Sequence, residues 1–405
     1  MNFSLNKRHI VVISDCYGGH NSGAKLLTDL TSELVDRGYN VANISTYRPR
    51  ATGKNYFAGS TAANFTRYLC RGLSEVLRAI AVPVRVFFLN PKIIFVYAPS
   101  IFLVPAGVFA AQISGAKCIL IQRDLVPQWM VDSEKIRRGG LAERLLLKVS
   151  YFNYRHVDGV AVQSERDREI LRQMPVYIGN VEVVPNWRNF NSFLSHRPAS
   201  FLAQKKIVSD ISKSPPKKPL RILYAGNIGE AQAIARVIVN LVKINRVYPI
   251  SLEIYGFGSQ LDSVLVNVTA AHDAGILSIY PLIDELSLFK RAHAFDYGLV
   301  CLDEKISTGI IPSKIATYLI AGLPLLGVAG RSSTLGEFIE SKKVGVFIPV
   351  LHDEKAFDDE KTCIEISNLL IKTISMYSPE HLVECAEREF AVEPVVDRLL
   401  EMAAS

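Results

Sequence analysis

The sequence has few cysteines, and none of them are spaced as metal or disulfide motifs. Six cysteines are separated by long intervals without a C-x-x-C pair, which argues against a zinc site or a disulfide framework. A D-x-D motif and a cluster of histidines and cysteines are also missing, so we expect no metal and no cofactor. Several cysteines lie in apolar stretches, which predicts buried free thiols in a reducing compartment. The six are Cys16, Cys70, Cys118, Cys301, Cys363 and Cys385.

We also expect no secretion signal, because "MNFSLNKRHI" has no apolar core. The longest uncharged stretch, residues 93–116, is long enough to span a membrane. Pro99, Pro105 and Gly107 divide it, so we expect a strand followed by a buried helix, with a transmembrane helix as the alternative. We therefore expect a cytoplasmic protein.

The sequence contains no P-loop. "SDCYGGHNSGAKLL" follows the apolar run "HIVVI" and spaces Gly18 and Gly23 as the P-loop does, but Ala24 stands where the P-loop lysine is required. Helix-turn-helix, zinc-finger, RRM-like and KH-like patterns are absent too. We therefore expect no nucleic-acid partner.

Short apolar runs, such as "IIFVY" and "LRILYAG", alternate with helical stretches along the whole chain. Such runs are typical of α/β proteins with doubly wound parallel sheets, which helices bury on both faces. A chain of 405 residues is long enough for two such domains. We expect an N-terminal domain over 1–190, a basic Pro/Lys linker over 191–219, a C-terminal domain over 220–385, and a last helix in 386–405 that packs back on the first domain.

Positive charge is concentrated in the first half of the chain. The formal charge is +10 over residues 1–190 and −8 over 221–405. This asymmetry favours an anionic partner for the first half. Arg67, Arg71 and Arg78 lie on one side of a helical wheel and are interleaved with leucines, which predicts a basic amphipathic helix on an anionic membrane surface. A solvated arginine face is the alternative.

Three loops in the second half place glycines between a strand and a helix. "YAGNIG" contains Gly226, and "IYGFGSQ" contains Gly256 and Gly258. Glycine at such places lets the backbone approach a ligand and leaves helix-terminal amides free for an anion. In the third, "STGIIPSKIATYLIAGLPLL", we expect Ser313 to cap a helix whose first turn includes Lys314. Loop amides and this ammonium would together suit a diphosphate.

The order of these motifs resembles that of a known family. "YAGNIG", "IYGFGSQ", "FKRAHAFDYGLVCL", "PSKIATYLIAGLPLL" and "VGVFIP" are similar to the donor half of retaining GT-B fold glycosyltransferases of the large bacterial family-4 type. "RDLVPQWMVDSEKI" and "VEVVPNWRN" resemble first-half segments of the O-antigen and capsule subgroup that includes L-fucosamine transferases. The resemblance covers nearly the whole chain. It implies two Rossmann-like domains that face each other across a cleft, the first for the acceptor and the second for the nucleotide-sugar donor.

The resemblance also implies which residues act. Asp124 would face the sugar as a catalytic residue, with a helix N-cap or a loop carboxylate as the alternative. Arg123 would bind an acceptor phosphate or sugar hydroxyls, because a guanidinium stays protonated and cannot act as a base. A solvated helix lysine is the alternative for Lys314. The residues expected to bind the donor are Gly18, Gly19, Gly226, Asn227, Gly256, Phe257, Gly258, Lys305, Thr308, Gly309, Ile310, Ser313, Lys314 and Thr317.

Four positions depart from the pattern of the family. Its paired glutamates map onto Gly309 and Thr317, so both carboxylates are absent. Its basic pair after the "AGN" glycine corresponds to Asn227 and Gln232. Lys305, Lys314, Arg291 and Arg331 are the cations that remain to neutralise a diphosphate.

The resemblance implies transfer of a sugar from a nucleotide diphosphate sugar, UDP-linked by expectation, with retention at the anomeric carbon. The acceptor would be a growing surface polysaccharide or a saccharide on polyprenyl diphosphate, reached from the inner face of the plasma membrane. One alternative is a catalytically silent homologue that binds a nucleotide sugar in an assembly complex. Another is a nucleotide-sugar epimerase of the same fold, although the sequence shows no cluster of carboxylates and histidines for it.

Overall fold

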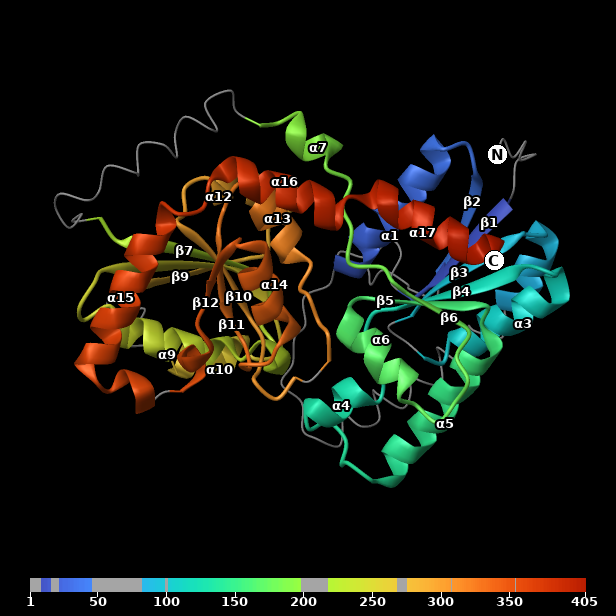
Figure 1. Ribbon diagram of the computed structural model, residues 1–405, viewed down its shortest axis with the longest axis horizontal. Coiled ribbons are helices and arrows are strands. Elements are labelled where there is room, and N and C mark those ends of the chain that lie inside the picture. The colour runs from blue at the N-terminus through green and yellow to red at the C-terminus, as the bar shows by residue number, and fades with distance from the viewer. Residues whose placement is uncertain are drawn as a thin grey trace. The chain divides into compact units, whose positions relative to one another are not determined.

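The computed structural model describes residues 9–15, 22–45, 82–98, 101–197, 218–267, 275–306, 308–353 and 355–405. The chain forms two compact units (Figure 1). Unit 1 comprises Met1–Trp187 and Val392–Ser405, and unit 2 comprises Arg188–Ala391.

Unit 1 contains a parallel sheet with the strand order β2-β1-β3-β4-β5-β6. Its central strands are continuous apolar runs, and every residue of β3 is buried, as expected for a sheet covered on both faces. The strands are β1 (His9–Ser14), β2 (Asn40–Ser45), β3 (Ile93–Ala98), β4 (Lys117–Gln122), β5 (Gly159–Val162) and β6 (Asn180–Val183).

Helices cover both faces of the unit 1 sheet. On one face, α1 and α17 lie side by side (Figure 1). They pack on every second residue of β1, and the residues between them point to the other face. The other face is covered by α3, by parts of α5 and α6, and by a helical stretch over 82–89. The helices are α1 (Ser22–Asp36), α3 (Val104–Ser114), α4 (Gln128–Asp132), α5 (Leu141–His156), α6 (Glu165–Arg172) and α17 (Val392–Ala404).

Unit 2 contains a second parallel sheet, with the order β12-β11-β10-β7-β8-β9. The strands are β7 (Leu220–Asn227), β8 (Ile250–Phe257), β9 (Leu277–Tyr280), β10 (Tyr297–Cys301), β11 (Leu325–Val328) and β12 (Gly345–Phe347). One core forms where α9, α10 and α15 meet the sheet, and the other where α12, α13, α14 and α16 meet it (Figure 1).

The helices of unit 2 are α7 (Asn191–Leu194), α9 (Ile234–Ile244), α10 (Leu261–Asn267), α12 (Glu285–Ala292), α13 (Lys314–Ile320), α14 (Thr334–Lys342), α15 (Glu360–Ile374) and α16 (Pro379–Phe390), with short 3-10 turns at η2 (Glu230–Gln232), η3 (Pro349–His352) and η4 (Lys355–Phe357). The chain passes from unit 2 to unit 1 after Ala391 rather than at the expected residue 385. The reason is that α16 packs against α13 up to Phe390, so only α17 belongs to unit 1.

The predicted α/β architecture with doubly wound parallel sheets is confirmed. The uncharged stretch 93–116 forms β3 and α3, as expected, and none of the described helices is long and apolar enough to cross a membrane. Cys118, Cys301, Cys363 and Cys385 are buried and unpaired, as predicted. Cys16 and Cys70 lie outside the described residues, and so does most of the expected linker, residues 198–217.

Candidate functional site

The carboxyl ends of β7 and β8 bring two predicted glycine loops together. In the parallel register, Gly226 lies opposite Gly256 and Asn227 opposite Phe257. Gly226 has a φ of +124°, a conformation that favours glycine. A Cβ on Gly256 would lie 2.3 Å from the carbonyl oxygen of Gly226. At this position glycine is therefore required because one loop packs on the other, and not only because a ligand would approach.

Lys314 lies beside the Gly226 loop, although almost 90 residues separate it from β7 in the sequence. A Cβ built on Gly226 would be 3.4 Å from the Lys314 Nζ. The ammonium lies 3.6 Å from the centroid of the Tyr224 ring, within cation–π distance. The Tyr224 hydroxyl in turn donates a hydrogen bond to the Asn227 carbonyl at 2.5 Å. Tyr224 thus supports both the lysine and the loop, a role that sequence reasoning missed because tyrosine in a strand is usual core composition.

Burial lowers the pKa of Lys314 to about 8, and the nearby Cys301 thiol opposes this only in part. Desolvation disfavours the charged form of a lysine, and an anionic ligand would restore it. The site therefore holds a cation whose charge is costly until an anion binds.

The turn before α13 differs in detail from the prediction. Ser313 stands at the N-cap position but has helical backbone angles and makes no side-chain capping bond, so the predicted cap is wrong. The reason is that its backbone already follows the helix, whereas a capping serine needs extended angles. Thr308 is buried, and its hydroxyl has no hydrogen-bond partner among the described residues. Ile310 packs against the unit 2 core.

The two positions that lack the family's glutamates are both buried. Gly309 is buried in the turn, and Thr317 is 1 % exposed on the inner face of α13. Lys305 is exposed, and its backbone N–H donates to the Asp303 carboxylate at 2.9 Å. Arg291 pairs with Glu253 at 2.6 Å. Of the four cations named in the sequence, Lys314 is the one that the structure places against a glycine loop.

The loop after β7 is closed by its own side chains. The Asn227 side-chain amide and the Gly229 backbone N–H both donate to the Gln232 side-chain carbonyl at 3.1 Å. Asn227 itself is exposed, and the neighbouring Phe257 is 50 % exposed. An exposed aromatic ring beside a glycine loop can stack on a planar group.

In unit 1, Arg123 follows β4 and is 6 % exposed. Its guanidinium lies 4.6 Å from the Trp187 ring centroid, and one nitrogen donates to the Val184 carbonyl at 3.2 Å. Its Nε and its other terminal nitrogen have no partner among the described residues. Burial lowers its pKa to about 10. In this conformation Arg123 joins β4 to the turn after β6, and its side chain is not open to solvent.

Asp124 is only partly exposed, and burial raises the pKa of its carboxyl against the opposing charges of Arg123 and Lys135. The residue at the N-cap of α4 is Pro127, so Asp124 does not cap that helix. A carboxyl with a raised pKa next to a buried cation is the kind of group found at functional sites. Its assignment as a catalytic residue stays a prediction.

Several expected residues cannot be placed. Gly18 and Gly19 of the first loop lie outside the described residues, as do Arg67, Arg71 and Arg78. Among the described residues, the structure has no group of three or more histidine, cysteine, aspartate or glutamate side chains that could hold a metal ion.

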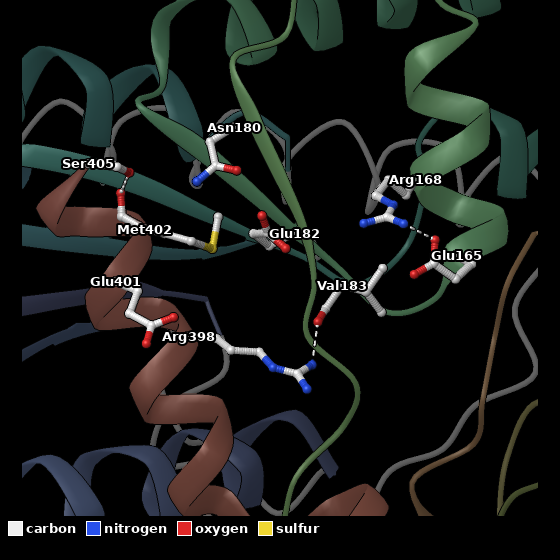
Figure 2. A pocket seen from close by; sticks show the side chains of 9 residues that line it. All are labelled: Glu165, Arg168, Asn180, Glu182, Val183, Arg398, Glu401, Met402 and Ser405. Atoms are coloured by element: carbon white, nitrogen blue, oxygen red, sulfur yellow. Dashed lines mark hydrogen bonds and ion pairs between the residues drawn. The ribbon is translucent and has the colours of Figure 1, made fainter.

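A pocket of about 400 Å³ lies within unit 1, between α6, β6 and α17 (Figure 2). Arg398 donates to the Val183 carbonyl at 2.9 Å, and Arg168 pairs with Glu165 across its other side. None of the residues predicted for the site line it. The lining residues are Glu165, Arg168, Asn180, Glu182, Val183, Arg398, Glu401, Met402 and Ser405. Its cations are thus already engaged by the protein, and we do not assign it to the candidate site.

Comparison with known proteins identifies relatives. Residues 23–187 match the model of the glycosyl transferase 4-like domain. The chain is 24% identical over 254 residues to WcaI of Escherichia coli (strain K12), a protein named for colanic acid biosynthesis. This match covers 62% of the chain and 61% of WcaI, which is less than two thirds of that relative.

Solved structures agree on the fold. A sucrose-phosphate synthase from Thermosynechococcus elongatus superposes with a TM-score of 0.68 at 15% identity, covering 98% of this chain and 100% of that one. Anabaena HepE, solved with UDP-glucose, has a TM-score of 0.63 at 12% identity, covering 98% and 99%. The chain therefore has the fold of GT-B glycosyltransferase structures, and its residues 23–187 are similar to the glycosyl transferase 4-like domain.

Proposed function

We propose that this protein is a glycosyltransferase that moves a sugar from a UDP-sugar to a growing surface polysaccharide or lipid-linked oligosaccharide, with retention of the anomeric configuration. The observation that carries the proposal is the Lys314 ammonium beside Gly226, at the carboxyl ends of neighbouring parallel strands. Ligands of open α/β sheets bind at these ends of the strands. A lysine and loop amides there suit a diphosphate.

The proposed chemistry needs no protein nucleophile. The bond between the anomeric carbon and the diphosphate oxygen breaks, and the acceptor oxygen bonds to the same face of the sugar. The proton of the acceptor hydroxyl passes to the departing phosphate. Lys314 stabilises the negative charge that develops on the leaving group, and the low exposure of its surroundings strengthens this interaction. We propose that Asp124 orients the sugar.

UDP is the proposed nucleotide because HepE, which shares the fold, has been solved with UDP-glucose and with UDP. The exposed Phe257 ring, beside Asn227, would stack on the uracil. The proposed acceptor is a saccharide on polyprenyl diphosphate, in keeping with the polysaccharide role in the name of WcaI. Because such an acceptor lies in a bilayer, we propose that the protein works at the inner face of the plasma membrane, with Arg67, Arg71 and Arg78 among its contacts.

A panel of nucleotides tests the donor. We expect UDP to raise the thermal midpoint more than GDP, dTDP or ADP, because the site in unit 2 is proposed to recognise uracil as well as the diphosphate. UDP-sugars that bind should then release free sugar slowly when no acceptor is present. If none of the four nucleotides shifts the midpoint, a donor site in unit 2 is ruled out.

A catalytically silent homologue is the second candidate. It is favoured by the absence of both glutamates, because Gly309 has no side chain and the Thr317 side chain is 1 % exposed. In that case UDP would bind without any turnover of UDP-sugars. An epimerase would instead interconvert two UDP-sugars without releasing UDP.

Replacing Asp124 with asparagine separates catalysis from donor binding. We expect turnover to fall at least about 100-fold while UDP affinity changes less than about threefold, because the carboxylate is proposed to contact the sugar and not the nucleotide. Kinetics with the best UDP-sugar, together with UDP titration, measure both effects. Asp158, an exposed aspartate of the same unit that pairs with Lys117 at 3.2 Å, is the control, and D158N should leave turnover unchanged. Equal turnover for D124N and wild type would remove Asp124 from the mechanism.

A further inference from the structure

One side of α5 exposes large apolar side chains to solvent. Leu141 is 74% exposed, Leu145 53% and Phe152 46%. At 100° per residue these three lie within about 40° of one another on the helical wheel. A surface helix of a globular unit usually turns its apolar side inward, so this stripe needs a partner.

Cations run along the edge of the apolar stripe. Arg144, Lys148 and Arg155 are exposed and lie within about 40° of one another, next to the leucines. None of the three forms an ion pair with a carboxylate of the described residues. The single acidic residue of α5, Glu143, points to the opposite side and accepts a hydrogen bond from the Gly139 backbone.

The inner side of α5 is anchored to unit 1, which fixes the outer side in place. Ser150 donates to the Val126 carbonyl at 2.8 Å, and Asn153 donates to the Ile101 carbonyl at 2.9 Å. Tyr154 is buried in the core beside them. The exposed stripe is therefore a stable feature of the folded unit.

The neighbouring helix α3 also exposes apolar side chains. α3 packs against α5, and Figure 1 shows the two at the same end of unit 1. Its sequence, VPAGVFAAQIS, contains no charged residue, and Phe109 and Ile113 are 56% and 41% exposed. An uncharged surface with a row of cations along one side complements the acyl boundary and the phosphates of an anionic leaflet.

We propose that this side of α5 is a membrane-docking surface. Leu141, Leu145 and Phe152 enter the headgroup region of an anionic bilayer, while the three cations bind lipid phosphates. Its residues are different from Arg67, Arg71 and Arg78, which the sequence predicts to contact a membrane. The inference deepens the membrane part of the proposed function, but lipid binding requires neither donor nor acceptor, so the two proposals can fail separately.

Vesicle flotation of the full chain tests the surface. We expect the wild type to float with vesicles that contain phosphatidylglycerol and to remain unbound with phosphatidylcholine alone. Because each cation at an anionic surface contributes roughly fivefold to partitioning, the triple variant R144Q/K148Q/R155Q should bind roughly 100-fold more weakly. Molar salt should release the wild type. The variant L141Q/L145Q should lose binding to the same vesicles although its charge is unchanged.

The matched control removes three exposed lysines of unit 2, K290Q/K361Q/K372Q, with the same change in net charge. It should bind as the wild type does, and equal thermal midpoints for all variants would exclude unfolding as the cause. Wild-type binding by the R144Q/K148Q/R155Q variant would overturn the proposal. A wild type that binds no vesicles would also overturn the proposal. In that case, a change of oligomeric state in the α5 variants would indicate that a second copy of this chain covers the surface.

Discussion

Replacing Lys314 with methionine is expected to weaken UDP binding roughly 10- to 100-fold, the usual range for losing one charged hydrogen-bonding partner of a phosphate. Methionine keeps the length of the side chain, so the ring of Tyr224 stays covered and the Gly226 loop stays packed. Calorimetric titration with UDP measures the loss. Lys290, an exposed lysine of α12, serves as the control, and K290M should bind UDP with wild-type affinity.

The affinity of this site for UDP is expected to decrease as the pH rises. Because the pKa of Lys314 is about 8, the lysine loses its proton as the pH rises through that value, and UDP affinity of the wild type should fall above pH 8. The affinity of K314M should stay flat over the same range. A wild type and a K314M variant with identical affinity at pH 7 would remove Lys314 from the donor site.

The same substitution is expected to raise the free energy of unfolding at pH 7. The pKa of Lys314 is lower in the folded state than in the unfolded chain, so the unfolded state binds more protons between pH 8 and pH 10.5. Stability of the wild type should therefore rise through this window, and the advantage of K314M should shrink with it. Urea unfolding at several pH values measures this, and a destabilised K314M at pH 7 would contradict it. Stability lost to a charged side chain and regained on anion binding is characteristic of a functional site.

The second large effect is expected at Gly258, where alanine should destabilise unit 2 by about 3 kcal/mol. A Cβ on this residue would lie 2.1 Å from the Ile228 carbonyl oxygen and 2.7 Å from its nitrogen. Two backbone hydrogen bonds hold Ile228 in place. The Ile228 N–H donates to the Phe257 carbonyl at 2.9 Å, and the Ile228 carbonyl accepts from the Gln260 N–H at 3.0 Å. Neither loop can move away without breaking one of them.

Urea unfolding and UDP titration measure the effect of G258A. Gly179 is the matched control, because a Cβ there meets only the Asp158 carbonyl oxygen at an ordinary 3.6 Å, and G179A should lie within about 0.5 kcal/mol of the wild type. If G258A is as stable as G179A, the two glycine loops are not as tightly packed as described. If it is destabilised yet binds UDP normally when folded, the loops are structural and the donor lies elsewhere.

Much of the site could be predicted from the sequence because its parts are local. Gly226 and Gly256 lie at the carboxyl ends of strands and Lys314 opens a helix, and ligands of parallel sheets bind at these ends of the strands. The reason for Gly256 and Gly258 was only partly predicted. They were expected to admit a ligand, whereas the structure shows that they also admit the backbone of the loop after β7, at Gly226 and Ile228.

The cations show where sequence reasoning stops. Four were candidates for the diphosphate, and nothing in their spacing distinguishes them. The structure distinguishes two of them, because Arg291 forms an ion pair with Glu253 whereas Lys314 lies on the Tyr224 ring beside Gly226. Arg123 was expected to be open to a ligand, and the structure packs it on Trp187, more than 60 residues away in the chain.

The sequence by itself determined that this chain has two doubly wound parallel sheets, because buried strands and covering helices are written as local patterns of apolar residues. It also marked the loops at the ends of the strands, because the local backbone geometry of such loops favours glycine. Only the tertiary structure decided which charges meet those loops. β7 lies between β8 and β10, so residues of a later crossover come beside Tyr224, and no periodicity along the chain encodes that strand order. The apolar and basic surface of α5 likewise became visible only when its opposite side was seen to be anchored in the core.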